Sequence, residues 1–176
     1  MNRYSPISHL SLLLIMAVML LAGCNNVQRE PDTPYQIDNE KFFNSFEGKA
    51  EYHKLLFANE DYPIYYKVIQ EAPAANKGIR PIQNSTVKVH VEGKLMSGEY
   101  FQRKTDNPTV MEIFNPEGSA NTIKGFRIAL QNMEVGSTWE VVIPWQLGYG
   151  RYSTGYIIPG YSTLIFTIEL LEIVNK

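Results

Sequence analysis

Hydrophobic and polar positions alternate along much of the second half of this 176-residue chain, and the alternation predicts β-strands. Residues 86–92, Thr-Val-Lys-Val-His-Val-Glu, show the strictest period of two, and Gly93 directly after them is expected to permit a bend. Ser97-Gly98 is typical of a hairpin turn that leads into residues 99–103. β-branched and aromatic residues predict three further strands, at 64–69, 138–144 and 162–173.

Two segments show helical spacing instead. Residues 123–133 form one, and Gly136 just beyond them is typical of a helix end. The other is expected to begin with Asp38 as its N-cap, with Ile37 and Phe42 forming a hydrophobic staple. Residues 104–121 have no clear pattern. One short helix among antiparallel strands, preceded by a helical extension, predicts an α+β domain.

The predicted extension carries a largely aromatic face at helical spacing, made of Phe42, Phe46, Ala50, His53 and Phe57. Such a face usually packs against the rest of the molecule. The alternative is a dimer contact through the 38–59 helix, or a surface for client proteins. A metal site at His53 is not expected, because no second ligand follows at helical spacing.

The chain begins with an apolar run at residues 10–22 that is too short to span a bilayer comfortably and suits the core of a signal peptide. It ends in Leu21-Ala22-Gly23-Cys24, which resembles the bacterial lipobox. This resemblance implies cleavage before Cys24, lipidation of that residue and attachment to a membrane of the bacterial cell envelope. Asn25 favours the outer membrane. A membrane-spanning signal anchor with an incidental cysteine is the alternative.

The domain organisation follows from these segments. We expect a lipoprotein signal peptide at 1–23, a polar, proline-containing tether at 24–37, the helical extension at 38–62 and the main domain at 63–176.

Composition excludes several classes of protein. With 16 Lys and Arg against 18 Asp and Glu, the chain lacks the strongly basic balance of nucleic-acid-binding proteins. The single cysteine excludes internal disulfides and zinc sites built on several thiolates. No phosphate-binding loop or nucleophile elbow is present, and His90 is expected in the core of its strand. No metal and no cofactor are therefore predicted.

Four motifs, in order, resemble one known family. They are Val87 to Phe101, the segment Ile123-Lys-Gly-Phe-Arg to Met133-Glu-Val-Gly136, Pro144 to Tyr149-Gly150, and Ile158-Pro-Gly-Tyr-Ser to Ile173. Together they resemble the FKBP-type peptidyl-prolyl cis-trans isomerases over roughly residues 64–174. The resemblance implies a strongly twisted antiparallel sheet wrapped around one short helix.

The resemblance also implies a role for individual residues in an apolar pocket that binds a prolyl peptide. Phe101 would form a wall and Phe126 the floor, where the family usually has Trp. Ile123 would offer its backbone N–H to a substrate carbonyl, and Tyr149 its hydroxyl at the rim. Ile158 and Phe166 would complete the lining. The implied partners are proline-containing unfolded or exported polypeptides.

Several pocket positions depart from the family pattern, among them Thr122, which replaces an aliphatic residue, and Thr109, where an aromatic residue is common. Val91 stands where a Tyr is common, and Gln102 replaces an Asp whose carboxylate strongly affects catalysis in the family. Two functions therefore stay open. One is a lipid-anchored prolyl isomerase that assists the folding of exported or envelope proteins. The other is a catalytically weak FKBP-like binding, chaperone or assembly module of an envelope complex.

Overall fold

A computed structural model describes residues 32–114, 122–155 and 157–175. The chain divides into two units, Met1–Pro31 and Asp32–Lys176, of which only the second contains described residues. The predicted signal peptide, most of the predicted tether and the lipidation site Cys24 therefore lie outside the described residues. Within the described ranges, no helix is long and apolar enough to cross a membrane.

The described unit is built on one antiparallel sheet with two helices and two short 3-10 turns. The strands are β1 (His53–Leu55), β2 (Ile64–Gln70), β3 (Thr86–Leu95), β4 (Tyr100–Gln102), β5 (Thr109–Glu112), β6 (Thr138–Ile143) and β7 (Leu164–Asn175). The helices are α2 (Pro34–Asn44) and α3 (Lys124–Asn132), and the 3-10 turns are Ala74–Asn76 and Trp145–Leu147. The predicted α+β class is confirmed.

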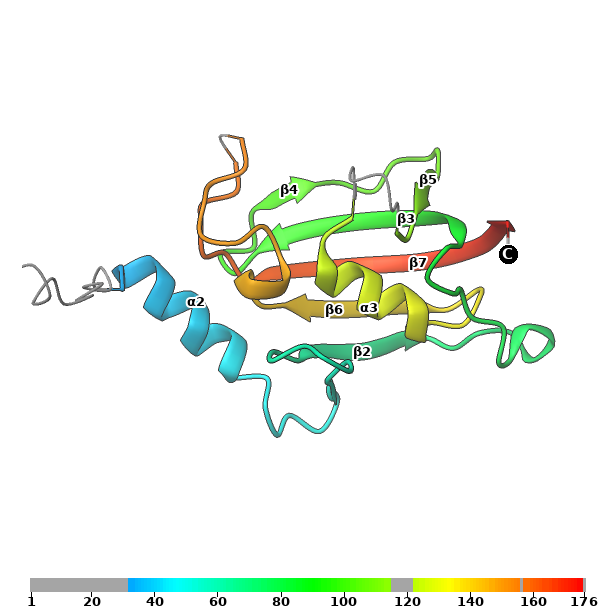
Figure 1. Ribbon diagram of the computed structural model, residues 1–176, viewed down its shortest axis with the longest axis horizontal. Helices are drawn as coiled ribbons and strands as arrows, with labels where there is room; N and C mark the ends of the chain where they lie inside the picture. Colours follow the sequence, from blue (N-terminus) through cyan, green and yellow to red (C-terminus); the bar gives the residue numbers. More distant parts are fainter. Residues whose placement is uncertain (1–31, 115–121, 156, 176) are drawn as a thin grey trace, which may run out of the picture. The chain divides into compact units, whose positions relative to one another are not determined.

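The sheet brings the two longest strands together at its centre. The strand order is β1-β2-β6-β7-β3-β4, and β5 pairs separately with β3. Figure 1 shows this order from β2 to β4, with α3 lying across one face of the sheet. β3 pairs with β7 along its whole length, from Leu95 opposite Leu164 to Thr86 opposite Asn175.

The face of the sheet that α3 covers holds the main hydrophobic core. Alternate residues of β3 are buried there, as the period of two predicts. The approach of α3 is close: a side chain on Gly125 would lie 2.4 Å from Cγ2 of Ile143. Because only a glycine fits, the helix settles directly onto β6.

The opposite face carries a smaller core beneath α2. Phe43 and Phe46 pack there against Tyr65, Val142 and Ile165, which alternate with the residues of the main core along their strands. The packing role proposed for the aromatic stripe is thus confirmed for Phe46.

The bounds predicted for the N-terminal helix were wrong at both ends. Thr33 is the N-cap, its Oγ1 accepting a hydrogen bond from the Gln36 N–H at 3.2 Å, and Pro34 takes the first helical position. Asp38 is therefore a residue inside the helix. The helix ends at Asn44, and the segment expected to continue it to residue 59 includes strand β1, which pairs with β2.

Because of this change, the residues of the predicted stripe do not share one helical face. Ala50, His53 and Phe57 lie beyond the helix and are exposed, with Phe57 38% exposed. The 38–59 helix proposed as a dimer contact does not exist in that form.

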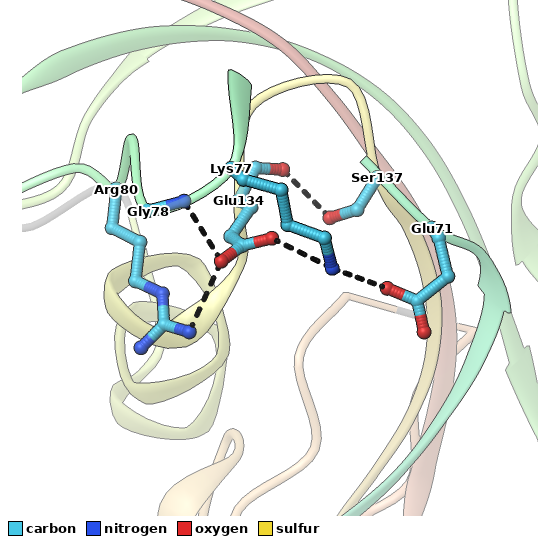
Figure 2. Close-up of polar contacts among 6 residues, drawn as sticks. All are labelled: Glu71, Lys77, Gly78, Arg80, Glu134 and Ser137. Atoms are coloured by element: carbon cyan, nitrogen blue, oxygen red, sulfur yellow. Dashed lines mark hydrogen bonds and ion pairs between the residues drawn. The ribbon is translucent and has the colours of Figure 1, made fainter. Parts of the chain in front are cut away.

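A carboxylate fixes the loop between β2 and β3. Glu134, two residues beyond α3, accepts hydrogen bonds from the Gly78 N–H at 2.9 Å and the Arg80 guanidinium at 3.4 Å. Lys77 lies between Glu134 and Glu71, with its Nζ 3.7 and 3.5 Å from their carboxylates (Figure 2). These contacts hold the pKa of Glu134 below its ordinary range, chiefly through the Gly78 hydrogen bond.

Candidate active site

Three aromatic rings from three different elements meet on the α3 face of the sheet. Phe166 of β7 is the central ring. Its centroid lies 5.4 Å from that of Phe101 on β4 and 5.2 Å from that of Phe126 on α3, and both pairs meet edge to face, at 82° and 84°. Phe126 and Phe166 are buried, whereas Phe101 is half-buried. The cluster thus has a closed floor and an accessible wall.

Gly93 makes this arrangement sterically feasible. A side chain at this position would lie 2.4 Å from Cε2 of Phe101 and 3.0 Å from Cε1 of Phe166. Gly93 lies within β3, which continues to Leu95, and the pairing of β3 with β4 is irregular between Gly93 and Lys94. The sequence did contain a signal for the actual role, since a glycine inside an alternating strand often marks a close approach.

The start of α3 brings a free hydrogen-bond donor to the cluster. Ile123 is the N-cap, with φ −61° and ψ 153°, and its side chain packs half-buried against the main core. Its carbonyl accepts from Phe126 and Arg127, but in the described part of the chain its own N–H has no acceptor. A free N–H at a helix start is well suited to bind a carbonyl oxygen.

The loop between β6 and β7 contributes the remaining predicted residues. Ile158 is buried in the same core as Phe126 and Phe166, and a bridge to Thr154 shapes the loop around it. Tyr149 is 41% exposed, and its hydroxyl has no hydrogen-bond partner among the described residues. The surrounding protein desolvates this hydroxyl and raises its pKa above the ordinary value, which keeps the group protonated and able to donate.

Val91 and Gln102, which depart from the family pattern, differ in their surroundings. Val91 is buried in the main core with Phe126 and Phe166. Gln102 is exposed at the end of β4, where it pairs with Gly93 of β3. The structure thus brings Phe101, Ile123, Phe126, Ile158, Phe166 and Val91 into one core, whereas Tyr149 and Gln102 are exposed.

The chemistry of this site depends on shape and burial. Between residues 32 and 114, 122 and 155, and 157 and 175, no three His, Cys, Asp or Glu side chains gather closely enough to hold a metal ion. His90, expected in the core, is instead half-buried on the other face of β3, because it falls on the alternate set of positions. What the described residues of the site offer a ligand is an aromatic floor and the N–H of Ile123 at the start of α3.

A family model described as FKBP-type peptidyl-prolyl cis-trans isomerase matches residues 77–171. The chain belongs to this family. The matched range includes every residue of the aromatic site, and it confirms the resemblance seen in the four motifs.

Relatives support the same conclusion for this FKBP-type chain. It is 38% identical over 110 residues to the FKBP-type 22 kDa peptidyl-prolyl cis-trans isomerase of Escherichia coli, covering 62% of this chain and 50% of that protein. It is 34% identical over 137 residues to the outer membrane protein MIP of Legionella longbeachae, covering 72% of this chain and 54% of that protein. The chain thus spans about half the length of these relatives.

Solved structures confirm the FKBP-like fold. The crystal structure of a peptidyl-prolyl cis-trans isomerase from Pseudomonas syringae matches with a TM-score of 0.67 and 26% identity, covering 82% of this chain and 99% of that one. The structure of FkpA from Escherichia coli matches with a TM-score of 0.66, and its 20% identity supports the fold alone.

Proposed function

We propose that this chain is a peptidyl-prolyl cis-trans isomerase that assists the folding of proline-containing exported or envelope proteins. The observation that carries the proposal is the edge-to-face cluster of Phe101, Phe126 and Phe166 at the start of α3, next to the free N–H of Ile123. Family membership supports the same activity.

The proposed mechanism needs no nucleophile and no proton transfer. A prolyl amide rotates slowly because its resonance must be broken, at a barrier of about 18–20 kcal/mol. Water stabilises the planar, charge-separated amide better than an aromatic pocket does. Transfer into the pocket therefore favours the twisted amide, whose charge separation is smaller.

Each polar group has a part in this scheme. The Ile123 N–H binds a substrate carbonyl and fixes the peptide relative to the rings, while the Tyr149 hydroxyl, at the rim, binds a second carbonyl. The rings of Phe126 and Phe166 receive the proline, and Phe101, together with the side chains of Val91 and Ile158, encloses it.

The test is an isomerisation assay on prolyl peptides, with the full chain kept in non-ionic detergent. We expect catalysis above the uncatalysed rate, and Phe101→Leu should lower kcat/KM about tenfold or more because the accessible wall loses its ring. Tyr100→Leu, at an exposed neighbouring position, is the matched control and should retain activity. A wild-type rate equal to the uncatalysed rate would reject the proposed isomerase activity.

The second candidate, a catalytically weak binding or assembly module, is favoured by one observation. Gln102 is neutral and exposed where the family pattern has an Asp. If the missing carboxylate limits turnover, Gln102→Asp should raise kcat/KM. Prolyl-peptide binding without catalysis, in both the wild type and this variant, would support the binding module.

We further propose that the protein is attached to the bacterial outer membrane through lipid on Cys24. The lipobox-like sequence that ends at this residue supports the anchor. A relative named as an outer membrane protein supports the envelope location.

A further inference from the structure

A cavity lies beneath α2, away from the aromatic site. It has a volume of about 330 Å³, within the range of small-ligand pockets. It is bordered by the smaller core, where Phe43 and Tyr65 pack, and by the segment Pro144–Gln146. The residues that matter for its chemistry are Glu40, Glu47, Tyr62, Tyr65, Trp145 and Gln146.

Aromatic side chains form much of the wall, and several of them are fixed. Tyr65 is buried and lies against Phe43, with ring centroids 5.0 Å apart. Trp145 packs edge to face on Tyr161, with centroids 5.0 Å apart, and its indole N–H donates to Oε1 of Glu40 at 3.1 Å. Tyr62 is 43% exposed. The cavity therefore has rigid inner rings and a more accessible ring at Tyr62.

The lining has more hydrogen-bond acceptors than donors. Oε1 of Glu40 accepts from Gln36 and Trp145, but its Oε2 has no partner among the described residues. Oε1 of Gln146 is buried, and nothing in the described part of the chain donates to it. Because the Gln146 oxygen is closed off from solvent, Oε2 of Glu40 is the acceptor left for a ligand that brings its own donors.

The lining of the cavity also carries more negative than positive charge. Glu40 and Glu47 carry two negative charges, and Lys54 supplies one positive charge, which is already paired with Glu47 at 2.8 Å. The carboxylate of Glu40 is only partly exposed, and solvent therefore screens it less than a free surface charge. A net negative charge among aromatic rings favours a cation that bears hydrogen-bond donors.

We propose that this cavity binds an arginine or lysine side chain of a polypeptide, with arginine preferred. A guanidinium is planar, stacks on aromatic rings and offers several donors at once, which suits the rings of Trp145 and Tyr62 and the carboxylate of Glu40. That the polypeptide is a client of the isomerase rests on the proposed function. The segment Pro144–Gln146 leads within three residues to Tyr149, so one loop borders both sites.

The experiment measures binding of a labelled peptide with one arginine and no proline, by fluorescence anisotropy, to the full chain in non-ionic detergent. The comparison peptide carries citrulline, which keeps the shape of arginine without its charge. We expect the citrulline peptide to bind at least about fivefold more weakly. Glu40→Gln, which keeps an acceptor for Trp145, should weaken arginine binding by a similar factor. Glu112→Gln, at an exposed position outside the cavity, should leave it unchanged.

Tyr62→Ala provides an independent test, because this exposed side chain can be removed with little effect on folding, and it should also weaken arginine binding. Equal affinity for the arginine and citrulline peptides overturns the proposal. So does an equal loss of affinity in Glu40→Gln and Glu112→Gln, since that result means general attraction to negative charge. The peptide has no proline, so failure of the isomerase assay is a separate result.

Discussion

At the residue scale, the aromatic site depends on the absence of a side chain at Gly93. The Phe101 ring occupies the space where a side chain of Gly93 would be, and Phe166 lies just behind it. An alternating strand pattern permits any small residue at this position. The glycine itself signals a close approach, but its partner becomes visible only from the packing of Phe101, in the irregular register that places Gly93 opposite Gln102.

Gly93→Ala should therefore displace the Phe101 ring. We expect a loss of about 1–3 kcal/mol in the free energy of unfolding, as for other overpacked cores, together with a lower kcat/KM. Urea denaturation and the isomerisation assay measure the two effects. In a Phe101→Ala background the same change should cost clearly less, because the closest contact is gone. Additive losses would show that another contact of the new methyl group matters more.

The site residues differ in how far the sequence could predict them. Phe101, Phe126, Ile158 and Phe166 are apolar at motif positions, and the structure brings all four into one core. The sequence could not reveal that Phe166 is central and 3% exposed, because burial is set by the packing of three elements. Phe166→Ala consequently tests stability as much as function, with an expected loss of about 3–5 kcal/mol.

At the element scale, the long strands and the short hairpin strand β4 were predictable from the sequence, whereas β1 and β5 were not. The alternation within β3 and the β-branched character of β2, β6 and β7 give these strands a pattern of their own. β1 and β5 have only three and four residues, and they are strands because β2 and β3 pair with them. A local sequence pattern does not predict which segments pair with one another.

Helix α2 had a readable start signal in Thr33-Pro34, which the polar surroundings obscured. No pattern in the sequence indicated the contact of α2 with the start of β7. The Asn39 side chain is fully buried, donates to the Tyr35 carbonyl at 2.9 Å and accepts from the Thr163 N–H at 2.7 Å. The Asn39 carbonyl also accepts from the Thr163 hydroxyl at 3.0 Å. A buried Asn thus joins the helix to the residue just before β7.

Asn39→Ala should lower the free energy of unfolding by about 1–3 kcal/mol, because the buried Thr163 N–H loses its acceptor. Chemical denaturation measures this loss. Asp38→Ala, one position earlier and exposed, should change stability by less than about 0.5 kcal/mol. A large effect of Asp38→Ala would instead restore this residue as the N-cap that the sequence suggested.

The contacts of Glu134 predict that the stability of the fold depends on pH. A carboxyl whose pKa is lower in the folded than in the unfolded chain stabilises the fold above its ordinary pKa, near 4.5. This stabilisation is lost as the pH falls from there through the lowered pKa. Glu134→Gln should therefore be less stable than the wild type at pH 7, and the difference should shrink toward pH 3. Denaturation at both pH values, with Glu112→Gln as the control, tests this. A difference independent of pH would mean that the contacts of Figure 2 act without the charge.

At the scale of the whole molecule, two features bear on how the domain is presented to its clients. Residues 34–37, expected in the tether, belong to α2, so the polar segment after Cys24 is shorter than the sequence suggested. The same helix carries Glu40 and borders the cavity beneath it. In an anchored chain, α2 would follow the tether directly, and its Glu40 contacts Trp145 of the loop that leads to Tyr149.

The anchor itself is tested by Cys24→Ser in the full chain. We expect this variant to lose incorporation of labelled fatty acid and to leave the membrane fraction, because the acyl chains supply the membrane affinity and serine cannot take the thioether-linked lipid. Asn25→Asp is the matched control: it should keep the lipid and shift the protein from the outer toward the inner membrane. A Cys24→Ser protein that stays membrane-bound would favour an uncleaved signal anchor at residues 10–22, since that segment holds the membrane without any lipid.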